Sequence, residues 1–210
     1  MNKSIVLLTV LALWGFPVLA ATTLYENNFE NATVDQVPAD FLVLDGDFAV
    51  KQGDGNKYLE LPGAPLDTFG VLFGPTTNAG VQVSARIYGT GKGRRYPRFG
   101  IGLNGPSGYK LRVSPQINAI EIYKGDESIT NVPFAWKSGT WTMLKLQVRA
   151  AGGQDWKIEG KAWGQSDPEP ADWMIAVDEK DAPHPGRASL WGAPYSGTPI
   201  RFDDLALTTE

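Results

Sequence analysis

Apolar and polar residues alternate one by one along most of the chain after Thr22. The clearest runs are 81–88, 109–113, 120–123, 144–149 and 156–161. Successive side chains of a β-strand point to opposite faces, so a period of two is typical of half-buried antiparallel strands. No stretch of twelve residues carries a helical stripe free of glycine and proline. The pattern therefore predicts an all-β protein.

Turn-forming residues separate these runs. Glycine, proline, asparagine and aspartate cluster at 53–56, 62–63, 104–106, 124–126 and 152–153. Many short strands divided by such turns indicate a β-sandwich or a β-barrel. No repeat or long linker divides the chain, so we predict a single domain over residues 21–210.

The first twenty residues differ from the rest. Lys3 is followed by the uncharged segment 4–20, which Gly15 and Pro17 interrupt near its end. This arrangement predicts a secretory signal peptide over residues 1–20, cleaved after Ala20. We expect an exported protein, periplasmic or extracellular. No later apolar run approaches 18 residues, so we expect no membrane insertion after cleavage.

Composition and charge narrow the possible functions. The chain has no cysteine, which excludes a disulfide scaffold, a thiol enzyme and a cysteine-based zinc site. It has one histidine, which excludes a centre with several histidine ligands. Without Lys3 it carries 18 basic and 23 acidic residues, a net charge of about −5. Net acidity and export both argue against a nucleic-acid partner.

The polar positions of the middle strands are nevertheless basic. They hold eight cations and two carboxylates. If these strands share one face, that face would attract anions, with arginine for carboxylate or sulfate and aromatic rings for sugar. Gly100 and Gly102 also point outward and would leave a shallow groove. The residues that we predict to bind a ligand are Arg86, Tyr88, Arg98, Arg112, Glu121, Tyr123, Lys145 and Trp163. The alternative is an ordinary solvent-exposed face.

The aromatic residues divide by position. Alternation and size place one group in the core, namely Trp141, Trp156, Trp191, Phe99, Phe202 and Tyr109. Trp136, Trp163 and Trp173 lie off the apolar rows, so we expect them to be more exposed.

Several segments resemble a known superfamily. They are 24–30, 46–50 with 58–61, the G-x-W-x-x-h-x-h run at 139–146 (h being apolar), and 186–192 with 200–207. Together they resemble the concanavalin A-like lectin/glucanase superfamily, and most of all its bacterial exported laminin-G-like and 3-keto-disaccharide-hydrolase-like domains. The resemblance implies an antiparallel two-sheet β-sandwich, a jelly roll, spanning residues 22–208. That fold hosts lectins, hydrolases, lyases and adhesive modules, so it does not decide the function.

The same resemblance implies one structural calcium ion, which ties the first strand to the last. The matching ligands would be Glu30 and Asp203, since calcium prefers carboxylate and carbonyl oxygens. The alternative is that Asp203 caps the final strand or pairs with Arg201.

For the function, we expect a non-catalytic, lectin-like domain. Its partner would be a polysaccharide or glycan, and anionic polysaccharides are among the ligands that it could bind. The Glu-x-Asp-x-x-Glu motif of the laminarinase branch is absent, so we predict no catalytic residue. One alternative is a glycan-cleaving hydrolase or lyase. It would use Glu121 or Glu159, which could meet across strands, together with Tyr88 or Tyr123. The other alternative is a protein-interaction module of the laminin-G type.

Overall fold

The structure, a computed structural model, describes residues 21–64 and 67–210. The predicted signal peptide lies outside these residues. Within them the chain forms fifteen β-strands and one short 3-10 helix, η1 (Pro115–Ile117). None of the described residues belongs to a helix that is long and apolar enough to cross a membrane.

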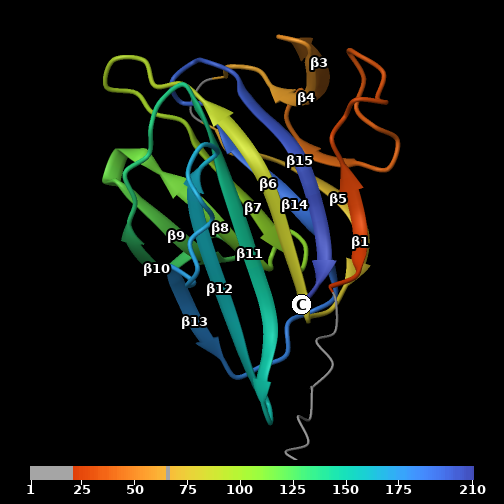
Figure 1. The fold of residues 1–210 in the computed structure, drawn as a ribbon, viewed down its shortest axis with the longest axis vertical. Helices are drawn as coiled ribbons and strands as arrows, with labels where there is room; N and C mark the ends of the chain where they lie inside the picture. The colour runs from red at the N-terminus through yellow and green to blue at the C-terminus, as the bar shows by residue number, and fades with distance from the viewer. Residues whose placement is uncertain (1–20, 65–66) are drawn as a thin grey trace, which may run out of the picture.

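The strands form two antiparallel sheets, which Figure 1 shows as two layers with β6, β11, β12 and β15 in front of β7, β8 and β14. In the eight-stranded sheet the order is β13-β12-β11-β6-β15-β4-β3, and β1 pairs with β15. Its strands are β1 (Thr23–Asn27), β3 (Ala49–Gly53), β4 (Asn56–Leu61), β6 (Val81–Gly89), β11 (Thr140–Gly152), β12 (Asp155–Gly164), β13 (Ile175–Glu179) and β15 (Ile200–Thr209).

In the seven-stranded sheet the order is β10-β9-β8-β7-β14-β5-β2. Its strands are β2 (Leu42–Asp45), β5 (Phe69–Thr77), β7 (Arg98–Leu103), β8 (Tyr109–Ser114), β9 (Ala119–Lys124), β10 (Glu127–Pro133) and β14 (Gly186–Ala193). The predicted fold class, an all-β two-sheet sandwich, is confirmed.

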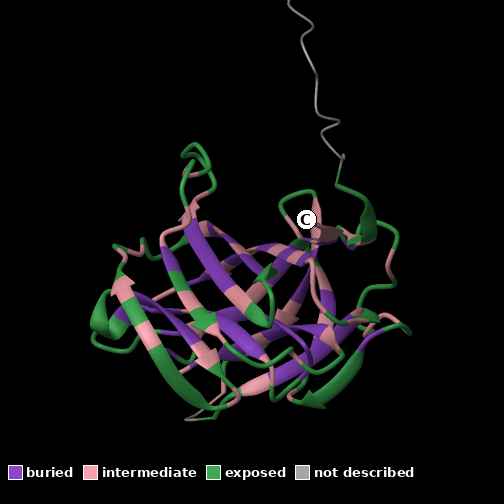
Figure 2. Ribbon diagram, turned by 90° about the horizontal axis from the view of Figure 1, so that it is seen from below, coloured by how far each residue is buried: buried purple, intermediate pink, exposed green. Residues whose placement is uncertain are grey.

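One apolar layer fills the space between the sheets, and Figure 2 shows the buried residues along its inside. On β6 the alternation is perfect, with Val83, Ala85 and Ile87 fully buried and the residues between them partly exposed. Burying a valine or isoleucine side chain in this layer contributes about 1.5–3 kcal/mol. Phe99, Phe202 and Tyr109 lie in this core, as predicted.

A buried charge cluster joins three strands of the eight-stranded sheet. The Asp203 carboxylate on β15 is inaccessible to solvent. Its Oδ2 accepts hydrogen bonds from the Arg86 guanidinium at 2.6 Å and from the Asn56 amide at 2.7 Å. Its Oδ1 accepts the backbone N–H of Asp204, which sits at a register shift of β15 with a positive φ of 48°. The cluster satisfies a polar group that the bulge brings into the sheet.

We predict that Asp203→Ala lowers the free energy of unfolding by about 3 kcal/mol or more, because it leaves the Arg86 charge without its buried partner. Urea unfolding at pH 7 measures the loss. The matched control is Asp204→Asn, because the Asp204 carboxylate is half exposed, lies 2.9 Å from Arg86 and makes no hydrogen bond to it. Asparagine tolerates the positive φ, so the control should lose less than about 1 kcal/mol. Equal losses in both variants would contradict the prediction.

Candidate functional site

The eight residues that we predicted to bind a ligand are divided between the two sheets. Arg86, Tyr88, Lys145 and Trp163 belong to the eight-stranded sheet, and Arg98, Arg112, Glu121 and Tyr123 belong to the seven-stranded sheet. They therefore do not form one shared basic face. The period of two shows which residues point outward, but it does not show to which sheet a strand belongs. For the same reason Glu121 and Glu159 do not meet across neighbouring strands.

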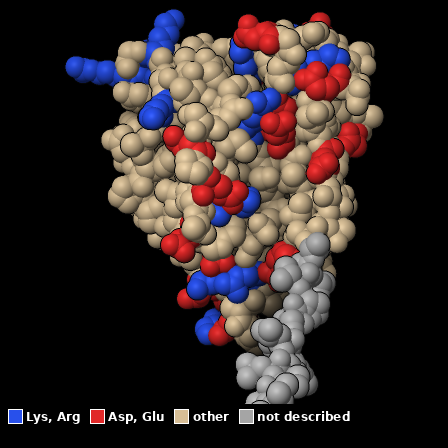
Figure 3. Space-filling model, viewed as in Figure 1, with Lys and Arg blue, Asp and Glu red and all other residues tan. Residues whose placement is uncertain are grey.

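On the eight-stranded sheet the outward cations are paired with carboxylates. Arg86 contacts Asp203, Lys145 and Lys161 both contact Glu169 at 2.7 Å, and Arg149 contacts Glu159 at 2.8 Å. Lys157 lies 3.9 Å from Asp178. Figure 3 shows Lys and Arg next to Asp and Glu across this side of the molecule. These cations are therefore neutralised within the protein.

The aromatic residues on the same sheet support arginines. The Arg86 guanidinium lies 4.7 Å from the centre of the Trp141 ring, and Tyr88 packs on Trp141 with a ring separation of 5.6 Å. Trp141 thus lies on the outer face and not in the core, contrary to our expectation. Trp163 is partly exposed and lines a separate hollow of about 460 Å³ with Phe134 and Pro168.

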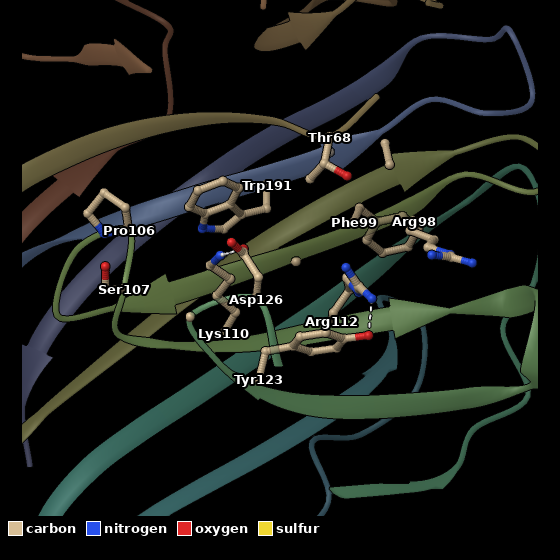
Figure 4. Close-up of a pocket in the computed structure, with 14 residues that line it drawn as sticks. Thr68, Arg98, Phe99, Pro106, Ser107, Lys110, Arg112, Tyr123, Asp126 and Trp191 are labelled. Carbon is tan, nitrogen blue, oxygen red and sulfur yellow. Dashed lines mark hydrogen bonds and ion pairs between the residues drawn. The ribbon is translucent and has the colours of Figure 1, made fainter. Parts of the chain in front are cut away.

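The outer face of the seven-stranded sheet carries a hollow of about 640 Å³. Its charged side chains and two of its aromatic rings come from four strands and the β9–β10 turn (Figure 4). The residues are Arg98, Lys110, Arg112, Tyr123, Asp126 and Trp191. Gly100 lines the hollow as well, but a Cβ atom on it would lie 2.3 Å from the Leu111 carbonyl oxygen, so β8 closely approaches this position.

Trp191 lies on this outer face because glycines leave room for it. A Cβ atom on Gly70 would lie 2.6 Å from the indole ring, so the ring rests over the neighbouring strand. Gly102 leaves space for Ser189, whose hydroxyl accepts the indole N–H at 2.8 Å. Our expectation that Trp191 packs in the core is therefore wrong. Alternation alone could have placed it outside, since it follows the buried Leu190.

Lys110 lies over the face of the Trp191 ring. The Lys110 ammonium lies 3.9 Å from the centre of the ring, and the Lys110 side chain is only 9% exposed. Its hydrogen-bond partner is Asp126, at 3.2 Å. Lys110 is one of the eight outward cations that alternation predicts, but nothing in the local sequence distinguishes a lysine that packs on a distant tryptophan.

A second cation lies on a second ring. The Arg112 guanidinium is 3.8 Å from the centre of the Tyr123 ring and donates a hydrogen bond to the Tyr123 hydroxyl. The buried Glu121 carboxylate accepts hydrogen bonds from the hydroxyls of Ser114, Ser128 and Tyr123. It lies 3.9 Å from Arg112. The structure therefore brings three of the predicted residues, Arg112, Glu121 and Tyr123, into one network.

Arg98 is the third cation of the hollow. Its guanidinium donates to Gln116 at 3.4 Å and lies 5.4 Å from the centre of the Tyr195 ring. Among the described residues it forms no ion pair with a carboxylate within 4 Å. Three cations thus line the hollow, against a single lining carboxylate, Asp126.

The two residues expected to hold calcium both have other partners in the structure. The Asp203 carboxylate already binds Arg86 and Asn56, so a cation there would face the guanidinium. Burial raises the pKa of the Asp203 carboxyl, and the hydrogen bonds that it accepts offset only part of that rise. Glu30 instead accepts the backbone N–H of Lys57 at 2.9 Å. No group of three or more His, Asp or Glu side chains suited to a metal occurs in the part of the chain that the structure describes. The calcium ion stays a prediction.

No protein-family model matches this sequence, and no curated protein sequence matches it. Solved structures match its fold. One is carbohydrate-binding module CBM66 from Bacillus subtilis, with a TM-score of 0.56 and 13% identity over 81% of this chain and 96% of that one. The alginate lyase from Aplysia kurodai gives 0.58 and 11% identity, covering 90% and 100%. A pseudo-β-1,3-glucanase of Mycobacterium tuberculosis gives 0.59 and 13% identity, covering 90% and 99%. These likenesses show the fold, which is the two-sheet jelly roll that the sequence motifs predicted.

The Glu169 cluster on the eight-stranded sheet gives a prediction about pH. Burial acts to raise the pKa of the Glu169 carboxyl, but the hydrogen bonds from Lys145 and Lys161 outweigh it and hold the pKa below its ordinary 4.5. A carboxyl with a lowered folded-state pKa stabilises the fold above its unfolded-state pKa and loses that effect as the pH falls through the folded-state value.

We therefore expect Glu169→Gln to be less stable than the wild type at pH 7, by less than about 1 kcal/mol because the carboxylate is partly exposed. The difference should close as the pH drops below 4.5. Urea unfolding across this range measures it, and Glu26→Gln, at an exposed position, is the control. A difference that persists at low pH would show that the charge pairing is not its cause.

Proposed function

We propose that this protein binds carbohydrate, and in particular acidic polysaccharide, in the hollow on the outer face of the seven-stranded sheet. The observation that carries the proposal is the charge of the lining: Arg98, Lys110 and Arg112 face one exposed carboxylate. Asp126 pairs with Lys110 and the buried Glu121 lies 3.9 Å from Arg112, so one net positive charge, that of Arg98, remains to attract anions. Arginine in addition offers two parallel N–H groups to a carboxylate or a sulfate.

The aromatic residues favour an acidic ligand over a neutral one. Neutral sugars stack on open aromatic faces, but the rings of Trp191 and Tyr123 each carry a cation less than 4 Å from the ring centre. The groups that the hollow presents are therefore N–H donors. A hollow on the face of a sheet also suits a polymer, since a long chain can lie across it.

The structural neighbours agree with a carbohydrate ligand. They include a carbohydrate-binding module, the carbohydrate recognition domain of Emp46p and an alginate lyase. We further propose that the chain is exported after cleavage at Ala20, since the N-terminal segment has the form of a signal peptide. An exported protein would meet polysaccharides of the cell surface or the surroundings.

The test is affinity electrophoresis of residues 21–210 through gels that contain polygalacturonate, alginate, dextran sulfate or neutral dextran. We expect the acidic gels alone to slow the protein, and high salt to weaken the effect because it screens exposed charges. Arg98→Met and Arg112→Met should each weaken binding by about tenfold, since a hydrogen bond to a charged group contributes about 1.5 kcal/mol or more.

Lys145→Met is the matched control, because it removes a cation from the eight-stranded sheet that Glu169 already neutralises. Its binding should equal that of the wild type. If no gel slows the protein, it does not bind these polysaccharides in the hollow, and a protein partner of the laminin-G type becomes the better hypothesis.

The Tyr123 hydroxyl favours a second candidate function, cleavage of a uronic-acid polymer by β-elimination. In this reaction a base removes the proton beside the carboxylate, the bond to the next sugar oxygen breaks, that oxygen takes up a proton, and a carbon–carbon double bond forms. Tyr123 is the candidate base, because its hydroxyl lies in the hollow, accepts a hydrogen bond from Arg112 and donates one to Glu121 at 3.3 Å.

The two functions separate by their products. A lyase releases unsaturated sugars from polygalacturonate or alginate, which absorb ultraviolet light, and Tyr123→Phe would stop this release while retaining binding. A binding protein releases none. Binding without unsaturated products in the wild type would rule out the lyase and leave the non-catalytic function that we propose first.

A further inference from the structure

The ion pair between Lys110 and Asp126 joins two residues in opposite environments. The Lys110 side chain is 9% exposed and is fixed on the Trp191 ring, whereas the Asp126 side chain is fully exposed. An ammonium group has three N–H donors, and the bond to Asp126 is the only hydrogen bond that Lys110 makes to the residues the structure describes. A nearly buried cation thus depends on one carboxylate that lies in solvent.

Asp126 reaches Lys110 from outside the sheet. It belongs to the two-residue turn, Gly125-Asp126, between β9 and β10. Figure 4 shows its carboxylate pointing to Lys110 near the Trp191 ring. No other described residue forms a hydrogen bond to this carboxylate. The position next to Lys110 therefore accommodates a carboxylate, and the turn holds it there only weakly, because exposed ion pairs contribute little.

We propose that Lys110 is the subsite for the carboxylate of a uronic acid residue and that Asp126 occupies this subsite in the free protein. Ligand binding then exchanges one carboxylate for another at the same ammonium group. The inference rests on the proposed function and deepens it, since it names the acidic group and the residue that receives it. Asp126 would then lower the affinity of the site, because its carboxylate competes with the carboxylate of the ligand for Lys110.

The experiment measures the binding of polygalacturonate by isothermal titration calorimetry. Asp126→Asn removes the competing charge, so we expect the affinity to rise about two- to fivefold, the equivalent of an exposed ion pair. Glu127→Gln is the matched control, because it removes the same charge at the next position and Glu127 forms no ion pair within the described residues. Its gain should be clearly smaller.

A double-mutant cycle separates local competition from general repulsion. In a Lys110→Met background, which preserves the length of the buried stem, the gain from Asp126→Asn should disappear. If the gain persists there, or if Glu127→Gln gives as much, Asp126 acts only through its charge and the inference is wrong. Circular dichroism and thermal unfolding show whether each variant is folded.

The outcomes distinguish this inference from the proposed function. Binding of polygalacturonate with no specific effect of Asp126 overturns the inference alone. Absence of binding by the wild type and by Asp126→Asn overturns both. An equal gain for dextran sulfate and polygalacturonate would overturn the assignment of Lys110 to a carboxylate, because a sulfate would then serve as well.

Discussion

The two sheets share a single apolar layer, and this constraint determines where every polar residue of the strands lies. Each strand has one row of side chains that must enter the layer, so its other row must face outward. The molecule consequently has two outer faces, and the charges of the strands are distributed between them. How each face balances its charges then decides what that face can do.

On the eight-stranded face the protein supplies its own anions. Glu169 forms ion pairs with Lys145 and Lys161, and Asp203 forms one with Arg86. These pairs join a strand to another strand or to a loop. On the seven-stranded face Lys110 and Arg112 also have carboxylate partners, Asp126 and Glu121, and each of the two cations lies on an aromatic ring as well. A ring attracts a cation by about 0.5–2 kcal/mol without cancelling its charge. Lys110 on Trp191 and Arg112 on Tyr123 are therefore fixed in place and still able to attract an anion.

The sequence predicted the strands, the fold class and the outward position of most site residues, because alternation is a local signal. It did not predict which sheet each strand joins, since that depends on pairings between distant segments such as β7 with β14. Trp191 shows the consequence: alternation predicts its outward position, but its place over Gly70 and its contact with Lys110 depend on pairings with other strands. Asp203 shows it as well, since Arg86 is its partner only because β15 pairs with β6. Asp126 lies beside Lys110 because β8 pairs with β9, which brings Lys110 next to the β9–β10 turn.

The net charge of the chain, −4, does not oppose an acidic ligand at this site. At physiological salt, charges act over a Debye length of about 8 Å, while two packed sheets lie about 10 Å apart. A ligand on the seven-stranded face is therefore screened from the carboxylates beyond the opposite sheet and responds mainly to the groups around the hollow. These are three cations and Asp126, together with Glu121, which is buried and held by hydroxyl groups. Composition measures the sum of both faces, but a polymer that lies across one face experiences that face alone.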